Sequence, residues 1–316
     1  MNNDMIHGAL AAWGKTLERN RPDLCAAGSP ERSLDRRVVE ASAGELLLVE
    51  RISEGARHQK GRMAELQAIL GGQGLPVHGP LKSKEGHHHE KVEGHWFQVT
   101  PYIPGVPLDR PAYVGDGWRG EAVADFLISL REKESLCSDV MDGPGFDLPD
   151  YIEQLMVPVQ KHHPKLFDAL GEANRWLSER LFPKWDALPT ALCHGDVHGV
   201  NVIWGEYWIN AVIDWEFFGR KPELYDVANM VGCCGMENPS SLLTGLVPAM
   251  LERLKRASFA SPESWDLFPE LLVGLRYAWL SEWLRKEDAE MINLELSYIY
   301  LLMDNREKIG SAYAAI

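Results

Sequence analysis

The stretch LCHGDVHGVNVIWGEYWINAVIDWEFFGRKPELYDVAN, residues 192–229, decides the fold of this chain of 316 residues. Asp196 is followed five positions later by Asn201, then by a strand-like hairpin that leads into Asp214. Alternating apolar residues on both sides of a turn near Gly205 predict two short strands. A loop that carries Asp196 and Asn201, followed by a strand ending in Asp214, places three oxygen donors around one pocket.

These oxygen donors suit phosphoryl transfer, which needs a carboxylate beside the attacking hydroxyl and oxygen ligands for Mg²⁺. Mg²⁺ takes few protein oxygens and completes its shell with phosphates and water, so Asn201 and Asp214 suffice. A metal-dependent hydrolase fits less well, because its metal usually needs several His ligands and Asp and Asn suit Mg²⁺ better than Zn²⁺. The plain alternative is that the acids are surface residues and His194 is an ordinary core histidine.

Three segments of this stretch resemble a known family. HGDVHGVN (194–201) is similar to the catalytic loop H-G-D-x-x-x-x-N of the aminoglycoside phosphotransferase and choline kinase-like superfamily, which is related to the protein kinases. IDWE (213–216) resembles the metal-binding segment of that superfamily, and YDVAN (225–229) resembles its [FY]-D-[LIV]-A element. The resemblance implies an α+β, bilobal, protein-kinase-like fold with a small β-rich N-lobe and a larger, mainly helical C-lobe.

The same resemblance implies roles for five residues. Asp196 is the implied catalytic carboxylate, which orients the acceptor hydroxyl and accepts its proton, and His194 orients the loop. Asn201 and Asp214 are the implied ligands of Mg²⁺. Asp226 is expected to brace the loop. The implied cofactors are ATP and Mg²⁺, and the implied acceptor is a hydroxyl of a small molecule.

A phosphate clamp is implied further upstream. The superfamily holds the α- and β-phosphates with a basic residue on a small-lobe strand, paired with an acid on the next helix. The strand ELLLVERI offers Arg51, and the following helix offers Glu65. Arg51 departs from the commoner lysine, although arginine binds phosphate well through two parallel hydrogen bonds. The alternative is a surface arginine on an edge strand.

Two further nucleotide contacts are expected. In the segment AAGSPERS (26–33), backbone N–H groups and the hydroxyl of Ser29 or Ser33 could cover phosphates, although a plain turn fits equally well. The strand FQVTPYI leads into a connector, where the backbone of Pro101, Tyr102 and Ile103 is placed to contact adenine by the family resemblance.

The acceptor pocket is the least defined part of the prediction. Trp279 and Trp283 lie four apart and therefore share one helix face. With Glu216, they could enclose a cationic amine through cation–π contacts. The alternative, which we favour, places the two tryptophans in the helical core. Choline or ethanolamine is slightly favoured as acceptor, because IDWEFFGRKPELYDVAN resembles the choline kinase segment; homoserine, sugars and aminoglycosides stay possible.

The predicted layout has two lobes. Residues 5–19 show helical periodicity, RRVVEAS and ELLLVERI predict a strand hairpin turning at Ala43-Gly44, and the stretch beginning RHQKGRM predicts a helix. PYIPGVP suits a stiff connector. Helical patterns follow, roughly over 119–134, 149–160, 166–182, 222–232, 240–257, 267–285 and 287–304. We expect an ATP-binding lobe over 1–103 and a catalytic and acceptor-binding lobe over 104–316.

Composition narrows the possible partners and location. Lys and Arg total 32 against 46 Asp and Glu, a net charge of −14, which argues against nucleic acid or an anionic membrane as the main partner. The five cysteines include no C-x-x-C pair, so neither a disulfide framework nor a zinc site is expected. We predict a soluble, cytoplasmic protein without a signal peptide. The sequence gives no indication of an oligomeric state.

One rival interpretation belongs to another class. A non-catalytic, nucleotide-binding or scaffold protein could keep this fold after losing its chemistry. Such a protein is expected to lack Asp196, Asn201 or Asp214, and all three are present.

Overall fold

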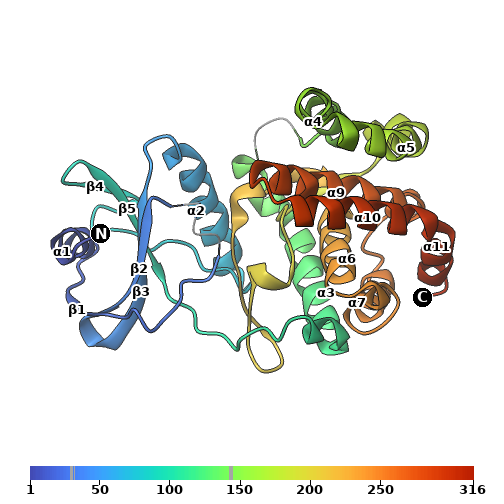
Figure 1. Ribbon diagram of the computed structural model, residues 1–316. Coiled ribbons are helices and arrows are strands. Elements are labelled where there is room, and N and C mark those ends of the chain that lie inside the picture. Colours follow the sequence, from blue (N-terminus) through green and yellow to red (C-terminus); the bar gives the residue numbers. More distant parts are fainter. Residues whose placement is uncertain (29–30, 32, 142–144) are drawn as a thin grey trace. The chain divides into compact units, whose positions relative to one another are not determined.

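The computed structural model describes residues 1–28, 31, 33–141 and 145–316. The chain divides into two compact units, whose elements are labelled in Figure 1. The first comprises Met1–Leu108, Glu132–Asp142 and Val200–Phe218, and the second Asp109–Arg131, Gly143–Gly199 and Gly219–Ile316. Two later segments thus join the N-terminal stretch, whereas the sequence predicted a single division at residues 103 and 104.

The first unit is built on a five-stranded antiparallel sheet with the strand order β1-β2-β3-β5-β4. The predicted hairpin is present as β2 and β3, and its turn residues Ala43 and Gly44 both have positive φ. The strands of this sheet are β1 (Leu17–Asn20), β2 (Asp35–Ala41), β3 (Glu45–Ile52), β4 (Glu90–Val92) and β5 (His95–Pro101).

The leading helix is shorter than its periodicity predicts. α1 spans Asn3–Ala12, and Gly14, with φ 71°, follows its end. The N–H of Lys15 donates to the carbonyl of Leu10 at 2.9 Å, which closes the last turn. Leu17–Asn20 then pairs with β2, because extended backbone here gains ladder hydrogen bonds that a longer helix would forgo.

The core of the first unit lies between α1 and one face of the sheet. Ile6 and Leu10 of α1 pack with Leu47 and Val49 of β3 and with Val99 of β5, and all five are at most 1% exposed. Side chains alternate along a strand, so the intervening residues of β3 face the other way. That second face is available to form a cavity with α2 (Arg57–Gly72).

A later hairpin belongs to the first unit because its backbone is hydrogen-bonded there. β7 (Val202–Trp204) and β8 (Ile209–Val212) pair antiparallel, as predicted. The N–H of Val212 donates to the carbonyl of Pro76 at 2.8 Å, and the N–H of Val106 donates to the carbonyl of Trp204 at 2.8 Å. These bonds explain why the β7–β8 hairpin, about a hundred residues downstream of β5, folds with the first unit.

The second unit is mainly helical, with one two-stranded pair, β6 (Thr190–Cys193) and β9 (Gly219–Pro222). Its α-helices are α3 (Gly117–Glu132), α4 (Leu148–His162), α5 (Pro164–Arg180), α6 (Tyr225–Glu237), α7 (Leu246–Arg256), α8 (Pro262–Asp266), α9 (Phe268–Arg285), α10 (Ala289–Asp304) and α11 (Arg306–Ala314). Short 3₁₀ turns in the chain are η2 (Ser42–Gly44), η3 (Ala112–Gly115), η4 (Glu134–Val140), η5 (Phe182–Ala187), η6 (Gly199–Asn201), η7 (Trp215–Phe217) and η8 (Pro239–Leu242).

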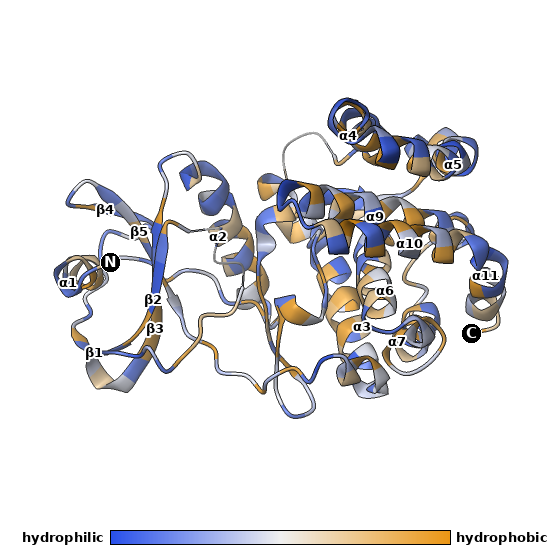
Figure 2. Ribbon diagram, in the orientation of Figure 1, coloured by the Kyte–Doolittle hydropathy of each residue, from blue (hydrophilic) through white to orange (hydrophobic). Residues whose placement is uncertain are grey.

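α9 is the central helix of this unit. It contacts α4, α5, α6, α8, α10 and α11, and its residues from Phe268 to Tyr277 are buried. In Figure 2 the outer helices α4 and α5 alternate between hydrophobic and hydrophilic colours. In α4 the buried positions Leu148, Ile152 and Met156 recur every four residues, as expected of a helix with one face on the core.

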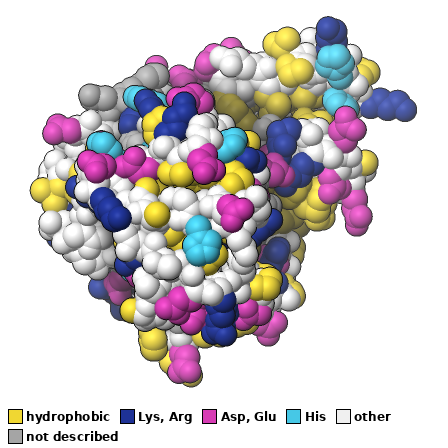
Figure 3. Space-filling view, turned by 90° about the vertical axis from the view of Figure 1, so that its left-hand side faces the viewer, with side chains coloured by type: hydrophobic (Ala, Val, Ile, Leu, Met, Phe, Trp, Pro, Cys, Tyr) yellow, Lys and Arg dark blue, Asp and Glu magenta, His cyan; other side chains and the backbone are white. Residues whose placement is uncertain are grey.

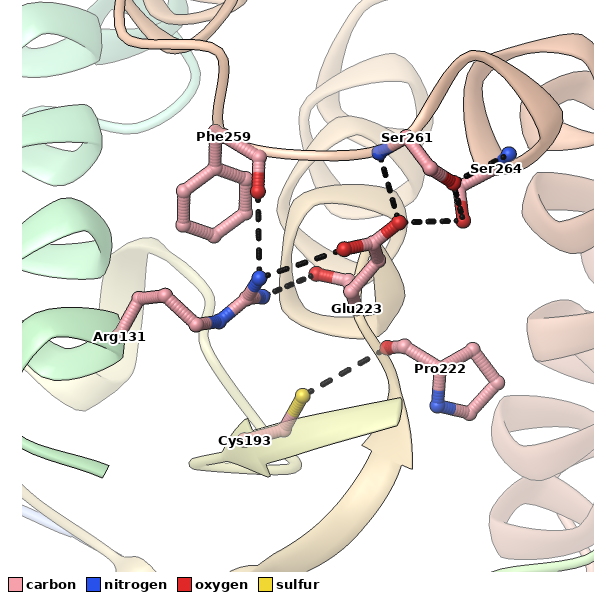
Figure 4. Close-up of polar contacts among 7 residues, drawn as sticks. All are labelled: Arg131, Cys193, Pro222, Glu223, Phe259, Ser261 and Ser264. Atoms are coloured by element: carbon pink, nitrogen blue, oxygen red, sulfur yellow. Dashed lines mark hydrogen bonds and ion pairs between the residues drawn. The ribbon is translucent and has the colours of Figure 1, made fainter. Parts of the chain in front are cut away.

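Glu223, directly after β9, joins three parts of the second unit (Figure 4). Its carboxylate accepts from the N–H of Ser261 at 2.8 Å and from the Ser264 hydroxyl at 2.7 Å. The Arg131 guanidinium lies 3.4 Å from the same carboxylate and donates to the Glu223 carbonyl at 2.9 Å. Glu223 is 8% exposed, so these donors compensate a buried charge just before α6 begins.

The face of the protein in Figure 3 carries charges of both signs, and the described cysteines form no disulfide. On the face shown in Figure 3, Lys and Arg side chains are interspersed with Asp and Glu side chains. All five cysteines are free thiols, and burial raises the pKa of Cys233 to about 12. Among the described residues, no helix combines the length and apolar character needed to cross a membrane.

Replacing Glu223 by Ala is expected to lower the free energy of unfolding by roughly 2–3 kcal/mol, because a buried, charge-assisted set of hydrogen bonds is lost. Urea unfolding followed by circular dichroism measures this change. The matched control is Glu121→Ala, since Glu121 is exposed on α3. Equal unfolding free energies for the two variants would contradict a structural role of Glu223.

Candidate active site

The loop after β6 is held by a buried carboxylate from α6. Asp226, which is 3% exposed, accepts from the backbone N–H of His194 at 2.7 Å and from that of Gly195 at 2.8 Å. Burial raises the pKa of Asp226, and the nearby His194 and the two N–H donors oppose that rise. Asp226 therefore fixes the backbone immediately before Asp196, which is the bracing position that the sequence predicts.

His194 is fully buried and also acts on the loop backbone. The N–H of Asp196 donates to His194 Nδ1 at 3.1 Å. Since Nδ1 accepts this bond, a neutral His194 ring carries its proton on Nε2. His194 is thus placed to orient Asp196.

The Asp196 carboxylate lies in a small polar cluster on the second unit. Its side chain is 25% exposed, and its Oδ1 lies 3.7 Å from His198 Nε2 and 3.5 Å from Asn229 Nδ2. Asn229 Nδ2 also donates to the carbonyl of Val197 at 3.1 Å, and Asn229 Oδ1 accepts from Trp279 Nε1 at 3.1 Å. The sequence analysis did not assign Asn229, although it lies three residues after Asp226 and so on the same helix face.

The two tryptophans of α9 pack together within this unit. Trp279 and Trp283 have ring centroids 6.0 Å apart, and Trp279 meets the His198 ring edge-on at 5.4 Å. Trp283 Nε1 donates to Glu295 at 3.2 Å. Glu295 itself is fully buried and paired at two points with Arg276, at 2.6 and 2.8 Å.

The first unit contains a cavity of its own. The end of β5 and the connector after it line the cavity through the predicted residues Pro101, Tyr102 and Ile103. Apolar side chains also line it: Met63 of α2, Ile203 and Ala211 of the hairpin, and Ile213 just after β8. The N–H of Tyr102 donates to the carbonyl of Leu46 at 2.9 Å, so the connector is anchored to β3. Such apolar lining suits a flat heteroaromatic ring.

Asp214 lines the same cavity from an unusual backbone conformation. Its φ of 63° and ψ of 58° are left-handed, which costs a non-glycine residue roughly 1–2 kcal/mol. Trp215 Nε1 donates to the carbonyl of Val212 at 2.9 Å, which helps to hold the turn. Such strained backbone gathers at functional sites, where the surrounding structure enforces it.

Asn201 is adjacent to Asp214 through the backbone. The N–H of Ile213 donates to the carbonyl of Asn201 at 3.0 Å, and Asn201 is 4% exposed. No group of three or more His, Cys, Asp or Glu side chains that could hold a metal occurs among the described residues. One carboxylate and one amide fit Mg²⁺, which completes its shell with phosphate and water oxygens.

Arg51 and Glu65, the predicted phosphate clamp, are not among the described residues that line this cavity. Arg51 follows Glu50 on β3, so it shares the sheet face of Val49, which packs against α1. Glu65 is exposed on α2, whereas Lys60, Met63 and Gln67 line the cavity.

Glu216, which was predicted for the acceptor pocket, belongs to the first unit. It lines the cavity of the first unit, and Lys60 Nζ lies 3.0 Å from its Oε1. The predicted companions of Glu216 in an acceptor pocket, Trp279 and Trp283, belong to the second unit, so that grouping stays a prediction. Within its own unit the carboxylate is paired with a lysine.

The predicted phosphate-covering segment is described in part. Ser29 lies outside the described residues. Ala26 and Ala27 line the cavity, and the Arg36 guanidinium donates to the carbonyls of Ala26, Ala27 and Gly28 at 3.2, 3.2 and 2.6 Å. Gly28 has φ 86°, and a Cβ there would lie 2.6 Å from Asp214 Oδ1, so only glycine fits this approach.

Glu50 lines the cavity as part of a hydrogen-bonded chain. Its carboxylate accepts from Ser33 Oγ at 2.7 Å and from Gln98 Nε2 at 2.5 Å. The side-chain Oε1 of Gln98 lies 3.2 Å from His89 Nε2. Burial lowers the pKa of His89 to about 4, so near neutral pH its uncharged ring donates to Gln98 and fixes the amide that serves Glu50.

The unfolding free energy is expected to fall as the pH drops from 6.5 to 4. In this range His89 is protonated in the unfolded chain but stays neutral in the folded protein, because folding lowers its pKa. After allowance for solvent screening, the loss amounts to about 1 kcal/mol. Urea unfolding at a series of pH values tests this. His89→Gln should flatten the slope and His87→Gln, on the exposed neighbour, should not; identical slopes for all three proteins would refute the assignment.

A sequence profile of the phosphotransferase enzyme family matches residues 30–268, more than half of the chain. A homoserine kinase of Acidiphilium cryptum is 22% identical over 231 residues, which cover 72% of this chain and 71% of that protein. A viomycin phosphotransferase of Streptomyces vinaceus is 25% identical over 155 residues, which cover 45% of this chain and about half, 51%, of that protein.

Solved structures share the fold. An amicoumacin kinase in complex with AMP-PNP and Ca²⁺ gives a TM-score of 0.61 at 14% identity, covering 96% of this chain and 94% of that one. An aminoglycoside phosphotransferase from Alicyclobacillus acidocaldarius gives 0.61 at 15% identity, covering 94% and 93%. The predicted α+β kinase-like fold is thereby confirmed.

Proposed function

The chain belongs to the phosphotransferase enzyme family, and from this premise we propose that it transfers the γ-phosphate of ATP to a hydroxyl beside Asp196. Its class is that of small-molecule kinases that phosphorylate hydroxyl acceptors. The observation that carries the proposal is the backbone around Asp196. Two N–H groups bonded to buried Asp226, and a third bonded to His194, hold this carboxylate in a fixed loop.

The cavity of the first unit is the proposed nucleotide site. Pro101, Tyr102 and Ile103 line it together with apolar side chains, which suits adenine, and Asp214 is one of the charged residues in the lining. The amicoumacin kinase, which has the same fold, was solved in complex with AMP-PNP, and this supports a nucleotide site in the present protein.

Asn201 and Asp214 are the proposed ligands of Mg²⁺. When bound, ATP and Mg²⁺ supply the phosphoryl group and neutralise the charge shared between its β- and γ-phosphates. The hydrogen bond from Ile213 to Asn201 holds the backbone of Asn201 next to the residue before Asp214, and the left-handed turn fixes the backbone of Asp214 itself. That preorganisation reduces the entropy lost on metal binding.

Asp196 is the proposed proton acceptor. As the acceptor oxygen bonds to the γ-phosphorus, the bond from that phosphorus to the β–γ bridging oxygen breaks, ADP leaves, and the hydroxyl proton passes to Asp196. His194 fixes the backbone of Asp196, while His198 and Asn229 flank its carboxylate. These residues position the carboxylate; they are not proposed to move protons.

For the acceptor we propose a small hydroxyl compound that carries an amine, with homoserine first and the amino alcohols choline and ethanolamine next. The homoserine kinase relative aligns with 72% of this chain. A cage for a quaternary amine has weaker support, because Glu216, the acid predicted for it, pairs with Lys60. Two acids of α9 and α10 are paired as well: Glu295 with Arg276, and Glu282 with Arg285 and Lys286.

A coupled ADP-release assay with Mg-ATP tests this function across homoserine, amino alcohols, sugars and aminoglycosides. We expect acceptor-dependent ADP release, and a loss of at least roughly 10²-fold in Asp196→Asn with ATP binding retained. Asp186→Asn, on an exposed acid of the same unit, is the matched control.

Full turnover by Asp196→Asn would overturn its catalytic role. If the wild type and Asp196→Asn both bind Mg-ATP but release no ADP with any acceptor, the result would instead favour a non-catalytic nucleotide-binding protein.

A further inference from the structure

The charges around the cavity of the first unit are arranged in an unexpected way. The position on β3 that faces the cavity is an acid, Glu50, and the cavity-lining cation on α2 is Lys60. The sequence analysis expected the opposite, a basic residue on the strand and an acid on the helix. The structure therefore raises the question of which cation receives the nucleotide phosphates.

Two other basic residues of this unit are less suited to that task. The Arg36 guanidinium donates to three successive carbonyls, those of Ala26, Ala27 and Gly28, and so holds the segment that covers the cavity. Arg51 lies on the sheet face that packs against α1, as shown by the alternation with Glu50.

Lys60 combines burial, cavity lining and proximity to the Asp214 turn. Its side chain is 9% exposed, and its ammonium lies 3.0 Å from Glu216 Oε1. Gln59 Nε2 donates to the Glu216 carbonyl at 3.1 Å, so two consecutive residues of α2 hold the acid two positions beyond Asp214. An ammonium carries three N–H donors, so Lys60 can keep Glu216 and still donate to a phosphate oxygen.

We infer that Lys60 binds the phosphate oxygens of the nucleotide and that Glu216 positions it; this rests on the proposed function. Glu50, which pairs across the sheet with Gln98 and Arg36, is an acid and therefore does not receive the phosphates. Lys60 lines the same cavity as Asp214, the proposed metal ligand. A buried lysine whose charge is balanced by one acid gains a second anionic partner when the nucleotide binds.

Calorimetric titrations of ADP with Mg²⁺ and of adenosine, which lacks phosphate, test this inference. Lys60→Met should weaken ADP binding at least roughly tenfold, the loss of one charge-assisted contact, and leave adenosine binding unchanged. Lys60→Arg should recover most of the ADP affinity. Arg51→Met, on the other sheet face, is the control and should bind ADP as the wild type does.

Lys60→Met leaves Glu216 without its lysine, so the double variant Lys60→Met, Glu216→Gln is measured as well. It removes both charges and should show the same loss for ADP alone. Unchanged ADP affinity in both variants would overturn the inference, and so would an equal loss for ADP and adenosine in both, which would indicate a structural role. A wild type that binds neither ligand would instead count against the proposed function itself.

Discussion

The strict alternation of side chains along β3 constrains everything around the cavity of the first unit. Leu47 and Val49 must face α1, because each buried aliphatic side chain contributes about 1.5–3 kcal/mol to the core. Leu48, which lies between them, and Glu50, which follows Val49, then face the cavity. A shift of one residue in register would expose the whole apolar set, so Arg51 stays on the sheet face of Leu47 and Val49.

The second unit depends on buried charges whose partners are mostly backbone groups or fixed side chains. Asp226 binds two N–H groups of the loop before Asp196, and Glu223 joins β9 to the turn at Ser261. The fully buried pair of Arg276 and Glu295 links α9 to α10. Each of these charges would be costly without its donors, so the same bonds that satisfy them also specify the geometry of the loop.

Much of this could be predicted from local sequence. The order of Asp196, Asn201, Asp214 and Asp226 predicted the family, and the alternation of residues 201–215 predicted the β7–β8 hairpin. What failed depended on tertiary context. The helical periodicity of residues 5–19 continued past Gly14, where the chain gained more by pairing with β2. Which face Arg51 occupies depended on packing against α1, and no short motif encodes that.

The roles of Lys60 and Asn229 were missed for a related reason. The significance of Lys60 depends on its contact with Glu216, which lies 156 residues away in sequence. The significance of Asn229 depends likewise on its contact with Trp279, which lies 50 residues away. The signal that was available is helical spacing: Asn229 follows Asp226 by three residues, and Met63 and Gln67 follow Lys60 by three and seven. Spacing shows which residues share a helix face, but not which part of the protein that face packs against.

The most direct test of the central claim, a nucleotide site whose metal is held by Asp214, is a calorimetric titration of ATP with and without Mg²⁺. The account predicts that Mg²⁺ strengthens ATP binding to the wild type by an order of magnitude or more and that Asp214→Ala abolishes this gain. ATP binding that ignores Mg²⁺ in the wild type, or a gain that survives in Asp214→Ala, would contradict it.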